Sequence, residues 1–453
     1  MLSAFVRAFR TPDLRRKLLF TIAIIAIFRV GSFIPTPGVN YQNVRQCTQL
    51  MQGDTGLLSL INVFSGGALL QLSIFALGIM PYITASIIIQ LLRVVIPRFE
   101  ALHKEGQAGQ AKMTQYTRYL AIALAILQST TVIVTARAGL LFPGCQEWGQ
   151  MFGLGDLSIL NDRSIVTMLI MVITMTAGTG LIMWLGELIT ERGVGNGMSL
   201  LIFVNIVAGF PAGLWSVLNS PATPTDLPGI NATNIRNFAI ILAVIVLVVG
   251  LVVYVEQSQR RIPVQYAKRM VGRKMYGGTS TYIPIKINMA GVIPVIFASS
   301  ILAMPTMIAQ FGDANAGWVQ WVQNNLAMPD APLHITLYAL MILFFCFFYT
   351  SITFNPDETA DNMKKYGGFI PGIRAGRPTA EYLNYVSTRI TSAGAIYLVV
   401  IALIPTLMMV FLGVSAHLPF GGTSILIMVG VGLETVKQID SQLQQRHYEG
   451  FLK

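Results

Sequence analysis

Long apolar runs recur along this chain and restrict what it can fold into. A helix that crosses a bilayer needs about 20 mainly apolar residues, because the hydrocarbon core is about 30 Å thick. Ten stretches meet this requirement and take up nearly half of the 453 residues. They lie near residues 18–34, 72–95, 117–136, 164–185, 199–218, 236–255, 288–308, 334–354, 386–412 and 420–436. The pattern predicts an all-α polytopic membrane protein with ten transmembrane helices.

The chain carries few charges for its length. Charged residues make up 11% of it, against about 25% in an ordinary soluble domain. Because so few charges cannot solvate the surface of a soluble protein of this size, the composition excludes a soluble enzyme, a disulfide scaffold and a disordered chain.

The 31 basic residues are distributed unevenly between the loops. With the N-terminus inside, 26 of them fall in inward segments and four in outward loops, while Arg29 lies within the first span. By the positive-inside rule, both termini are therefore predicted to be cytoplasmic, over residues 1–17 and 438–453. Arg29 lies near the outer end of its span, where a long side chain can snorkel to the interface.

The ten spans divide into five and five at a Pro-rich outward segment. We expect a first half over residues 18–218, an outward connector over 219–235 and a second half over 236–437. Because each half has an odd number of spans, the chain begins and ends it on opposite sides of the membrane. The second half is therefore expected to be inverted in the membrane relative to the first. Inverted repeats around a central site are common in transporter folds.

The segment 54–70 has two interpretations. It is apolar over residues 57–64, which is too short to span, and is broken by Gly66 and Gly67. One interpretation is an amphipathic helix on the outer surface. The other is a re-entrant piece, hinged at the two glycines and lodged in a protein-lined cavity where irregular backbone is tolerated. The residues alone leave both open.

Two inward loops are candidate docking surfaces. In 256–287, seven basic residues are interleaved with Tyr, and the apolar residues of both flanks alternate, which predicts a projecting strand pair. Such a surface can contact RNA phosphates or an acidic protein; the alternative is a solvated loop that only enforces topology. The second loop, 355–385, places Arg374 after a Pro-Gly turn, where a lone Arg commonly makes local hydrogen bonds.

Sequence motifs of enzymes and cofactor sites are absent. No P-loop occurs, and the four His have no Cys or carboxylate at metal-ligand spacing, so we expect no enzyme and no cofactor. The spans lack the buried carboxylates that ion-coupled transporters use as relays, which counts against the alternative function, a polytopic secondary transporter. A membrane scaffold that binds RNA or ribosomes without a pore is a third hypothesis. Cys47 and Cys145 both fall on the outward side, where a disulfide is conceivable, and the sequence leaves their pairing open.

Five stretches, in order, resemble the SecY family, whose members form the channel subunit of the bacterial protein translocase. They are FSGGALLQLSIFALGIMPYITASIIIQLL (64–92), WLGELITERGVGNGMS (184–199), NMAGVIPVIFASS (288–300), FFCFFYTSITFNPDETADNMKKYGGFIPGIR (344–374) and FGGTSILI (420–427). The resemblance implies ten transmembrane helices in two inverted five-helix halves around a central pore, with a re-entrant plug helix at about 54–70.

The resemblance also implies roles for particular residues. A ring of apolar side chains would form the constriction, with Met198 standing where the family has Ile: Ile79, Ile83, Met198, Ile202, Ile296 and Ile427. The plug would comprise Leu57, Leu58, Leu60, Ile61, Phe64, Ser65, Gly66 and Gly67. Without the motifs, isoleucines in spans are expected to face mostly lipid or neighbouring helices.

A lateral gate is implied between the second and third spans on one side and the seventh and eighth on the other. Three polar positions match it, although ordinary interhelical bonding explains them equally well: Gln90, Gln128 and Asn288. The two inward loops would receive the partners through Arg261, Lys268, Arg269, Arg273, Lys274, Arg374 and Arg377.

The implied function is a protein-conducting channel. It would translocate unfolded secretory polypeptides across the plasma membrane and insert membrane proteins laterally into it. The implied partners are the SecE and SecG subunits, the SecA ATPase, the ribosome, chains that bear signal sequences, and anionic lipids, with no dedicated DNA binding.

Overall fold

Helices make up most of the described part of the chain. The computed structural model describes residues 11–50, 65–137, 158–162, 164–219, 232–266, 280–309, 316–328, 331–412 and 422–449, with short pieces at 139, 141, 145, 269–271 and 274–276. The helices of the N-terminal half are α2 (Pro12–Gly31), α3 (Tyr41–Leu50), α5 (Met80–Val95), α6 (Pro97–Lys104), α7 (Gln107–Arg137), α9 (Ile165–Arg192) and α10 (Gly197–Asn219). Those of the C-terminal half are α11 (Ala232–Gln257), α12 (Ile293–Ala309), α13 (Gly317–Val322), η1 (Gln323–Ala327), α14 (Pro332–Thr353), α15 (Pro356–Lys365), α16 (Arg377–Leu412) and α17 (Gly422–Glu449).

Six helices of the described chain are long and apolar enough to cross a membrane, namely α7, α9, α10, α11, α14 and α16. Two shorter apolar helices, α5 and α12, coincide with further predicted spans. The remaining two predicted spans coincide with α2 and α17. Large apolar side chains such as Ile173, Val246 and Leu247 are exposed on these helices. An exposed apolar face is unfavourable in water and favourable in lipid, so the fold is that of a multi-pass membrane protein.

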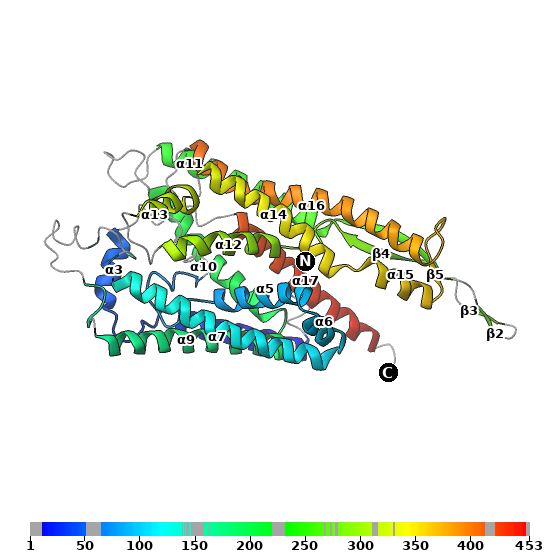
Figure 1. Ribbon diagram of the computed structural model, residues 1–453, viewed down its shortest axis with the longest axis horizontal. Helices are drawn as coiled ribbons and strands as arrows, with labels where there is room; N and C mark the ends of the chain where they lie inside the picture. Colours follow the sequence, from blue (N-terminus) through cyan, green and yellow to red (C-terminus); the bar gives the residue numbers. More distant parts are fainter. Residues whose placement is uncertain are drawn as a thin grey trace.

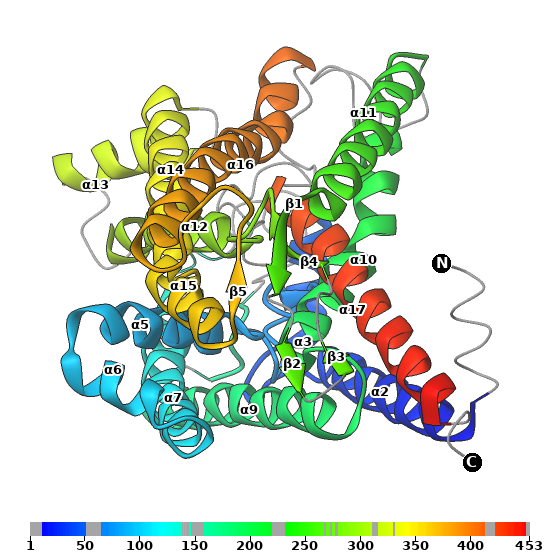
Figure 2. The ribbon, with the colours of Figure 1, turned by 90° about the vertical axis from the view of Figure 1, so that its right-hand side faces the viewer.

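The helices form two groups. Viewed down the long axis, α5, α6, α7 and α9 lie on one side and α11, α12, α14 and α16 on the other (Figure 2). A large apolar cluster holds the second group together, with Val252 of α11, Val295 of α12, Ile342 of α14 and Leu398 of α16 almost fully buried. Helix α10 contacts α9 of the first group and α11 of the second and so joins the two groups.

The second predicted span, 72–95, is helical only from Met80 onward. Residues 65–79 instead form turns, with a bridge between Pro35 and Ser73. Gly78 has a φ of +57° just before the helix, a conformation that few L-residues adopt. Pro81 is the second residue of the helix, in the first turn, where the amide that proline lacks is not needed. The seventh span also starts late, at Ile293 rather than 288, after Gly291 with a φ of +61°.

A disulfide joins Cys47 of α3 to Cys145, with the two Cα atoms 5.6 Å apart. Both cysteines are buried in an apolar cluster with Leu72, Leu141 and Met171. The structure therefore answers the question that the sequence left open, since the pair is bonded and its surroundings are packed.

The predicted strand pair is confirmed. Strand β1 (Gln259–Tyr266) pairs antiparallel with β4 (Ser280–Lys286), and short strands β2 (Arg269–Val271) and β3 (Lys274–Tyr276) pair beyond them. A further strand, β5 (Gly368–Phe369), pairs with β1 from its other edge. Figure 1 shows β4, β5 and α15 at one end of the long axis, with β2 and β3 projecting past them.

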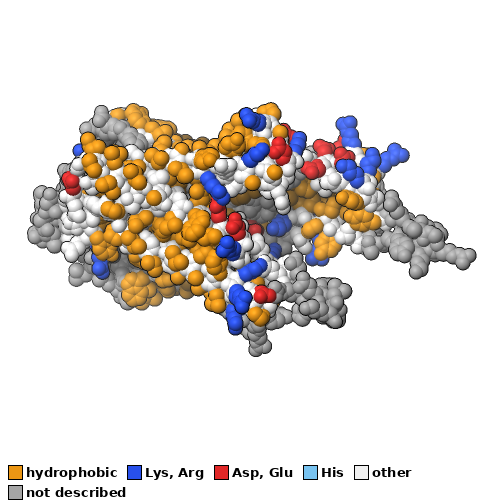
Figure 3. Space-filling model, turned by 90° about the horizontal axis from the view of Figure 1, so that it is seen from below, with side chains coloured by type: hydrophobic (Ala, Val, Ile, Leu, Met, Phe, Trp, Pro, Cys, Tyr) orange, Lys and Arg blue, Asp and Glu red, His pale blue; other side chains and the backbone are white. Residues whose placement is uncertain are grey.

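The surface changes character along the long axis. Apolar side chains cover most of the body, whereas Lys, Arg, Asp and Glu gather toward the end that carries the strands (Figure 3). Ion pairs occur there, including Lys104–Glu100 at 2.7 Å and Arg377–Glu381 at 3.2 Å. The hydrogen bond from Lys104 lowers the pKa of the Glu100 carboxyl. A charged end beside an apolar body is the distribution expected of a protein whose body lies in lipid.

Candidate functional site: pore, gate and docking loops

The six residues of the predicted ring lie together. They belong to one apolar cluster, to which α5, α10, α12 and α17 each contribute. Ile79, Ile202 and Ile427 are buried within it at 2%, 7% and 2% exposure, and Ile83, Met198 and Ile296 are partly buried against them. The cluster thus joins α5 of the first group to α12 of the second.

Local chain features position these side chains. Ile79 occupies the N-cap of α5, directly after the left-handed Gly78, and Ile83 follows one helical turn later. On α10, the side-chain oxygen of Asn196 accepts hydrogen bonds from the amides of Met198 and Ser199 at 3.2 and 3.4 Å. This N-cap satisfies two amides that would otherwise lack partners, and it fixes the helix that carries Met198 and Ile202.

Met198 is accommodated by a glycine on the facing helix. A Cβ atom built on Gly186 of α9 would lie 2.5 Å from the Met198 sulfur. A larger residue at position 186 would therefore force Met198 to move. The flexible thioether fills the space beside this glycine, which gives a packing reason for methionine at this position.

The hinge of the predicted plug is described in part. Ser65 is almost fully buried, and Gly66 and Gly67 have φ values of +66° and +90°, which favour glycine. The other predicted plug residues lie outside the described residues: Leu57, Leu58, Leu60, Ile61 and Phe64.

Arg29 contacts this hinge rather than only extending to the interface. Its Nη1 donates a hydrogen bond to the Gly66 carbonyl at 3.1 Å, and its guanidinium lies 5.4 Å from the centre of the Phe33 ring. A Cβ atom on Gly66 would lie 2.7 Å from the same Nη1. Arg29 therefore packs tightly on the glycine pair, which the sequence did not predict.

The predicted gate residues do not hydrogen-bond to one another in the described structure. Gln90 donates to Ser86 of its own helix at 3.5 Å. Gln128 lies half-buried on α7. Asn288 is 3% exposed and donates to Glu256 at 2.6 Å, within its own half of the chain.

Apolar packing closes the seam between α5 and the pair α12 and α14. Ile87 of α5 is buried in one cluster with Phe297 of α12 and Phe345 of α14. The two phenylalanine rings meet edge to face with centroids 5.4 Å apart. Contacts of this kind contribute through buried apolar area and ring geometry.

The two predicted docking loops form one unit. Ile262 and Val264 of β1 and Ile285 of β4 are buried against Leu383 and Val386 of α16. In addition, β5 pairs with β1, so the loop over 355–385 completes the sheet of the other loop. We call this structure the docking unit: strands β1, β4 and β5, helix α15 and the start of α16.

The predicted basic residues lie at the surface of the docking unit where they are described. Arg261 is exposed and stacks over Tyr282, with its guanidinium 4.8 Å from the ring centre. Arg374 and Arg377 are exposed. Arg269 and Lys274 lie on β2 and β3, whereas Lys268 and Arg273 lie outside the described residues.

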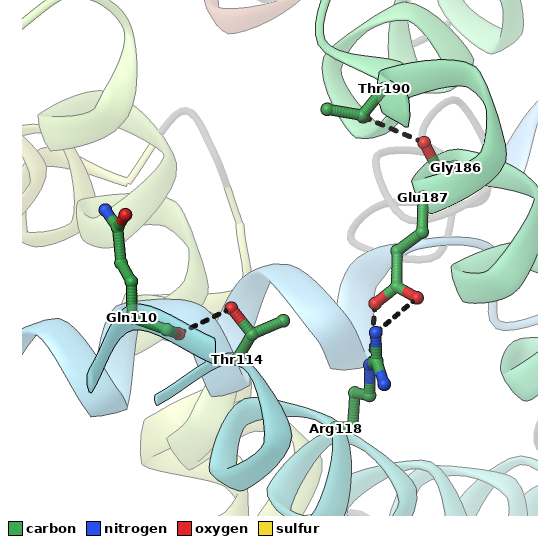
Figure 4. Close-up of polar contacts among 6 residues, drawn as sticks. All are labelled: Gln110, Thr114, Arg118, Gly186, Glu187 and Thr190. Atoms are coloured by element: carbon green, nitrogen blue, oxygen red, sulfur yellow. Dashed lines mark hydrogen bonds and ion pairs between the residues drawn. The ribbon is translucent and has the colours of Figure 1, made fainter. Parts of the chain in front are cut away.

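One ion pair between α7 and α9 was not predicted from the sequence. Arg118 of α7 and Glu187 of α9 point toward each other and form two hydrogen bonds of 2.7 Å each (Figure 4). The predicted spans begin at 117 and end at 185, so both charges lie at the inner ends of their spans, and both were counted with the inward segments. Opposite charges at the inner ends of consecutive spans are the signal that could have revealed the pair.

No group of three His, Cys, Asp or Glu side chains within the described ranges is placed to hold a metal ion. The candidate site thus comprises the cluster of the six predicted ring residues, which we call the collar, together with the seam and the docking unit.

Comparison with known proteins identifies the family of this chain. The family model described as SecY matches residues 73–436. The chain belongs to the SecY family. The protein translocase subunit SecY of Streptomyces galbus is 63% identical over 453 residues, with 100% of both chains covered. The SecY subunit of Mycobacterium tuberculosis is 58% identical over 466 residues, again with 100% of both chains covered.

Solved structures support the fold. A protein-conducting channel aligns with a TM-score of 0.59 at 19% identity, covering 93% of this chain and 91% of that one. Sec61 from a canine ribosome–channel complex aligns with a TM-score of 0.57 at 17% identity and the same coverage. The relatives are named as subunits of a protein translocase.

Proposed function

We propose that the chain forms a protein-conducting channel that passes unfolded secretory polypeptides across the plasma membrane and releases membrane proteins sideways into the bilayer. The observation that carries this proposal is the apolar cluster in which the six ring residues from α5, α10, α12 and α17 meet. Membership of the SecY family adds support, because the relatives are named as subunits of a protein translocase. Membership of this family also counts against the alternative function, a polytopic secondary transporter.

The chemistry of the collar suits this role. A narrow apolar constriction loses its water and blocks ions, yet it makes no specific bonds to a passing chain. Ile79 and Ile427 lie on different helices, and branched side chains of this kind can be pushed aside without breaking a polar contact. We propose that Ile79, Ile83, Met198, Ile202, Ile296 and Ile427 line the constriction.

The proposed architecture follows the predicted boundaries. Ten spans form two inverted halves over 18–218 and 236–437, joined by the outward connector 219–235, with residues 1–17 and 438–453 in the cytoplasm. Residues 54–70 form the re-entrant plug on the outer side. The buried Ser65 and the left-handed Gly66 and Gly67 favour a fixed hinge at the end of this segment.

The gate and partners complete the proposal. The apolar seam of Ile87, Phe297 and Phe345 is where a hydrophobic signal sequence would separate the two groups. Gln90, Gln128 and Asn288 are the polar positions of the proposed gate. The docking unit would receive the SecA motor or the ribosome through its exposed arginines. SecE and SecG would be companion subunits, and anionic lipids would face the basic inner side.

A crosslinking experiment tests the function. Photoreactive residues are placed at Ile79 and Ile296 and at Val246, an exposed position on α11. A secretory chain stalled during export should crosslink from the first two positions and not from Val246, because only the first two lie in the collar. Crosslinks of equal yield from Val246, or none from the collar positions, would show that the chain does not pass through this cluster.

A further inference from the structure

We propose that Glu256 is a positioning residue that ties the docking unit to the gate helix α12 through its hydrogen bond with Asn288. A partner bound to the docking unit would then act on the gate through this connection. The inference rests on the proposed function, which supplies the gate and the partner.

The contact itself is short and buried. The Asn288 amide nitrogen donates to the Glu256 carboxylate at 2.6 Å and to the Gly291 carbonyl at 3.1 Å. Asn288 is only 3% exposed. Hydrogen bonds to a charged acceptor are about twice as strong as neutral ones. The hydrogen bond to the Glu256 carboxylate is therefore stronger than the one to the Gly291 carbonyl.

The contact lies where the chain leaves the docking unit. Glu256 precedes β1 and Asn288 follows β4, and the first and last residues of this strand pair, Gln259 and Lys286, face each other in register. The Ile287 amide also donates to the Ser258 carbonyl at 3.2 Å. The Glu256–Asn288 hydrogen bond thus joins the chain just before β1 to the chain just after β4.

The residues that follow Asn288 connect two separate cores. Met289 packs on the apolar core of the docking unit with Leu383. Ala290 is buried in the membrane core with Val295 of α12. A movement of the docking unit would therefore be transmitted to α12 through residues 287–290. Within this segment, Asn288 makes the hydrogen bond to Glu256.

Helix α16 packs closely behind residues 287–290. Gly394 of α16 approaches so closely that a Cβ atom there would lie 2.6 Å from the Ile287 carbonyl oxygen. Lys286 and Lys437 lie close enough to Glu256 to interact with its charge favourably, whereas Glu434 interacts unfavourably. The Glu256 carboxylate is thus held at the junction by its hydrogen bond from the Asn288 amide.

Exchanging the donor and acceptor tests the bond directly. In N288D, two carboxylates face each other and the bond is lost. In the double variant E256Q/N288D, the new amide can donate to the new carboxylate, so the bond returns with reversed polarity. E434Q is the matched control, because it removes a nearby carboxylate that is exposed.

The measurement is export from membrane vesicles that contain the whole translocase. Two reporters are compared, one with an intact and one with a defective signal sequence. N288D should raise the ratio of defective to intact export about tenfold, the size expected for losing a charge-assisted hydrogen bond. The double variant should return to within about threefold of wild type, and E434Q should match wild type. Binding of the motor to the vesicles should not change.

Other results would overturn the inference. It is wrong if N288D leaves the ratio unchanged, if the double variant is not rescued, or if E434Q shifts the ratio equally. Should N288D fail to accumulate in the membrane, E256A and E256Q decide instead. The first should shift the ratio about tenfold, and the second, which keeps an acceptor oxygen, should stay within about threefold of wild type. Export of the intact reporter by the wild-type channel tests the proposed function separately.

Discussion

Replacing Ile427 by Asn should open the resting channel. Ile427 is 2% exposed and sits in the collar cluster with Ile79 and Ile202. Burying an isoleucine contributes about 1.5–3 kcal/mol relative to water. An amide without a partner in an apolar site costs about 1–3 kcal/mol. The substitution therefore destabilises the closed, dry collar by about 3 kcal/mol relative to a wetted one, which is roughly a hundredfold change in the ratio of the two.

Single-channel conductance in planar bilayers measures this change directly. The I427N channel should conduct ions at rest far more often than wild type, and it should export reporters with defective signal sequences. I427L should behave nearly like wild type, because swaps that conserve volume usually cost less than about 1.5 kcal/mol.

A matched control lies two residues away. Ile425 is on the same helix and is equally buried, but it packs in the core of the second helix group rather than in the collar. I425N should lower the amount of folded protein without raising resting conductance. If I425N conducts as much as I427N, the effect is general loosening and the collar assignment is refuted.

Three further substitutions test other contacts. Arg29→Met removes the donor to the Gly66 carbonyl and should raise resting conductance; unchanged conductance would show that the hinge does not depend on it. Glu187→Gln breaks the paired hydrogen bonds to Arg118 and should lower thermal stability in detergent by about 1 kcal/mol, given that both side chains are partly exposed; an unaltered unfolding midpoint would contradict this. Arg374→Glu should stop export driven by the motor while the protein still accumulates in the membrane, and normal export would disprove the docking role.

The general architecture was accessible from the sequence because lipid imposes strong rules. Apolar runs of about 20 residues are required for spanning helices, and the alternation of Ile262 and Val264 with polar residues is the signature of a half-buried strand. Both patterns lie within a single segment. The structure confirms the strand pair and six helices long enough to span, whereas the helices of the second and seventh predicted spans begin late.

The start of the helix in the second span could not be predicted from the sequence. Residues 72–79 are as apolar as the helix that follows, so hydropathy gives no sign of the change at Met80. The turns there depend on a left-handed Gly78 and on the bridge between Pro35 and Ser73. Such contacts join residues far apart in the chain, and no local pattern encodes them.

The amino-acid sequence by itself determined the membrane class, the charge asymmetry and the family, since each depends on composition or on motifs within one segment. Only the tertiary structure decided which polar groups pair. Asn288 bonds to Glu256, Arg29 bonds to Gly66, and the two docking loops merge into one sheet. The physical reason is that hydrogen bonds act over about 3 Å, so their partners are known only once the helices have been packed.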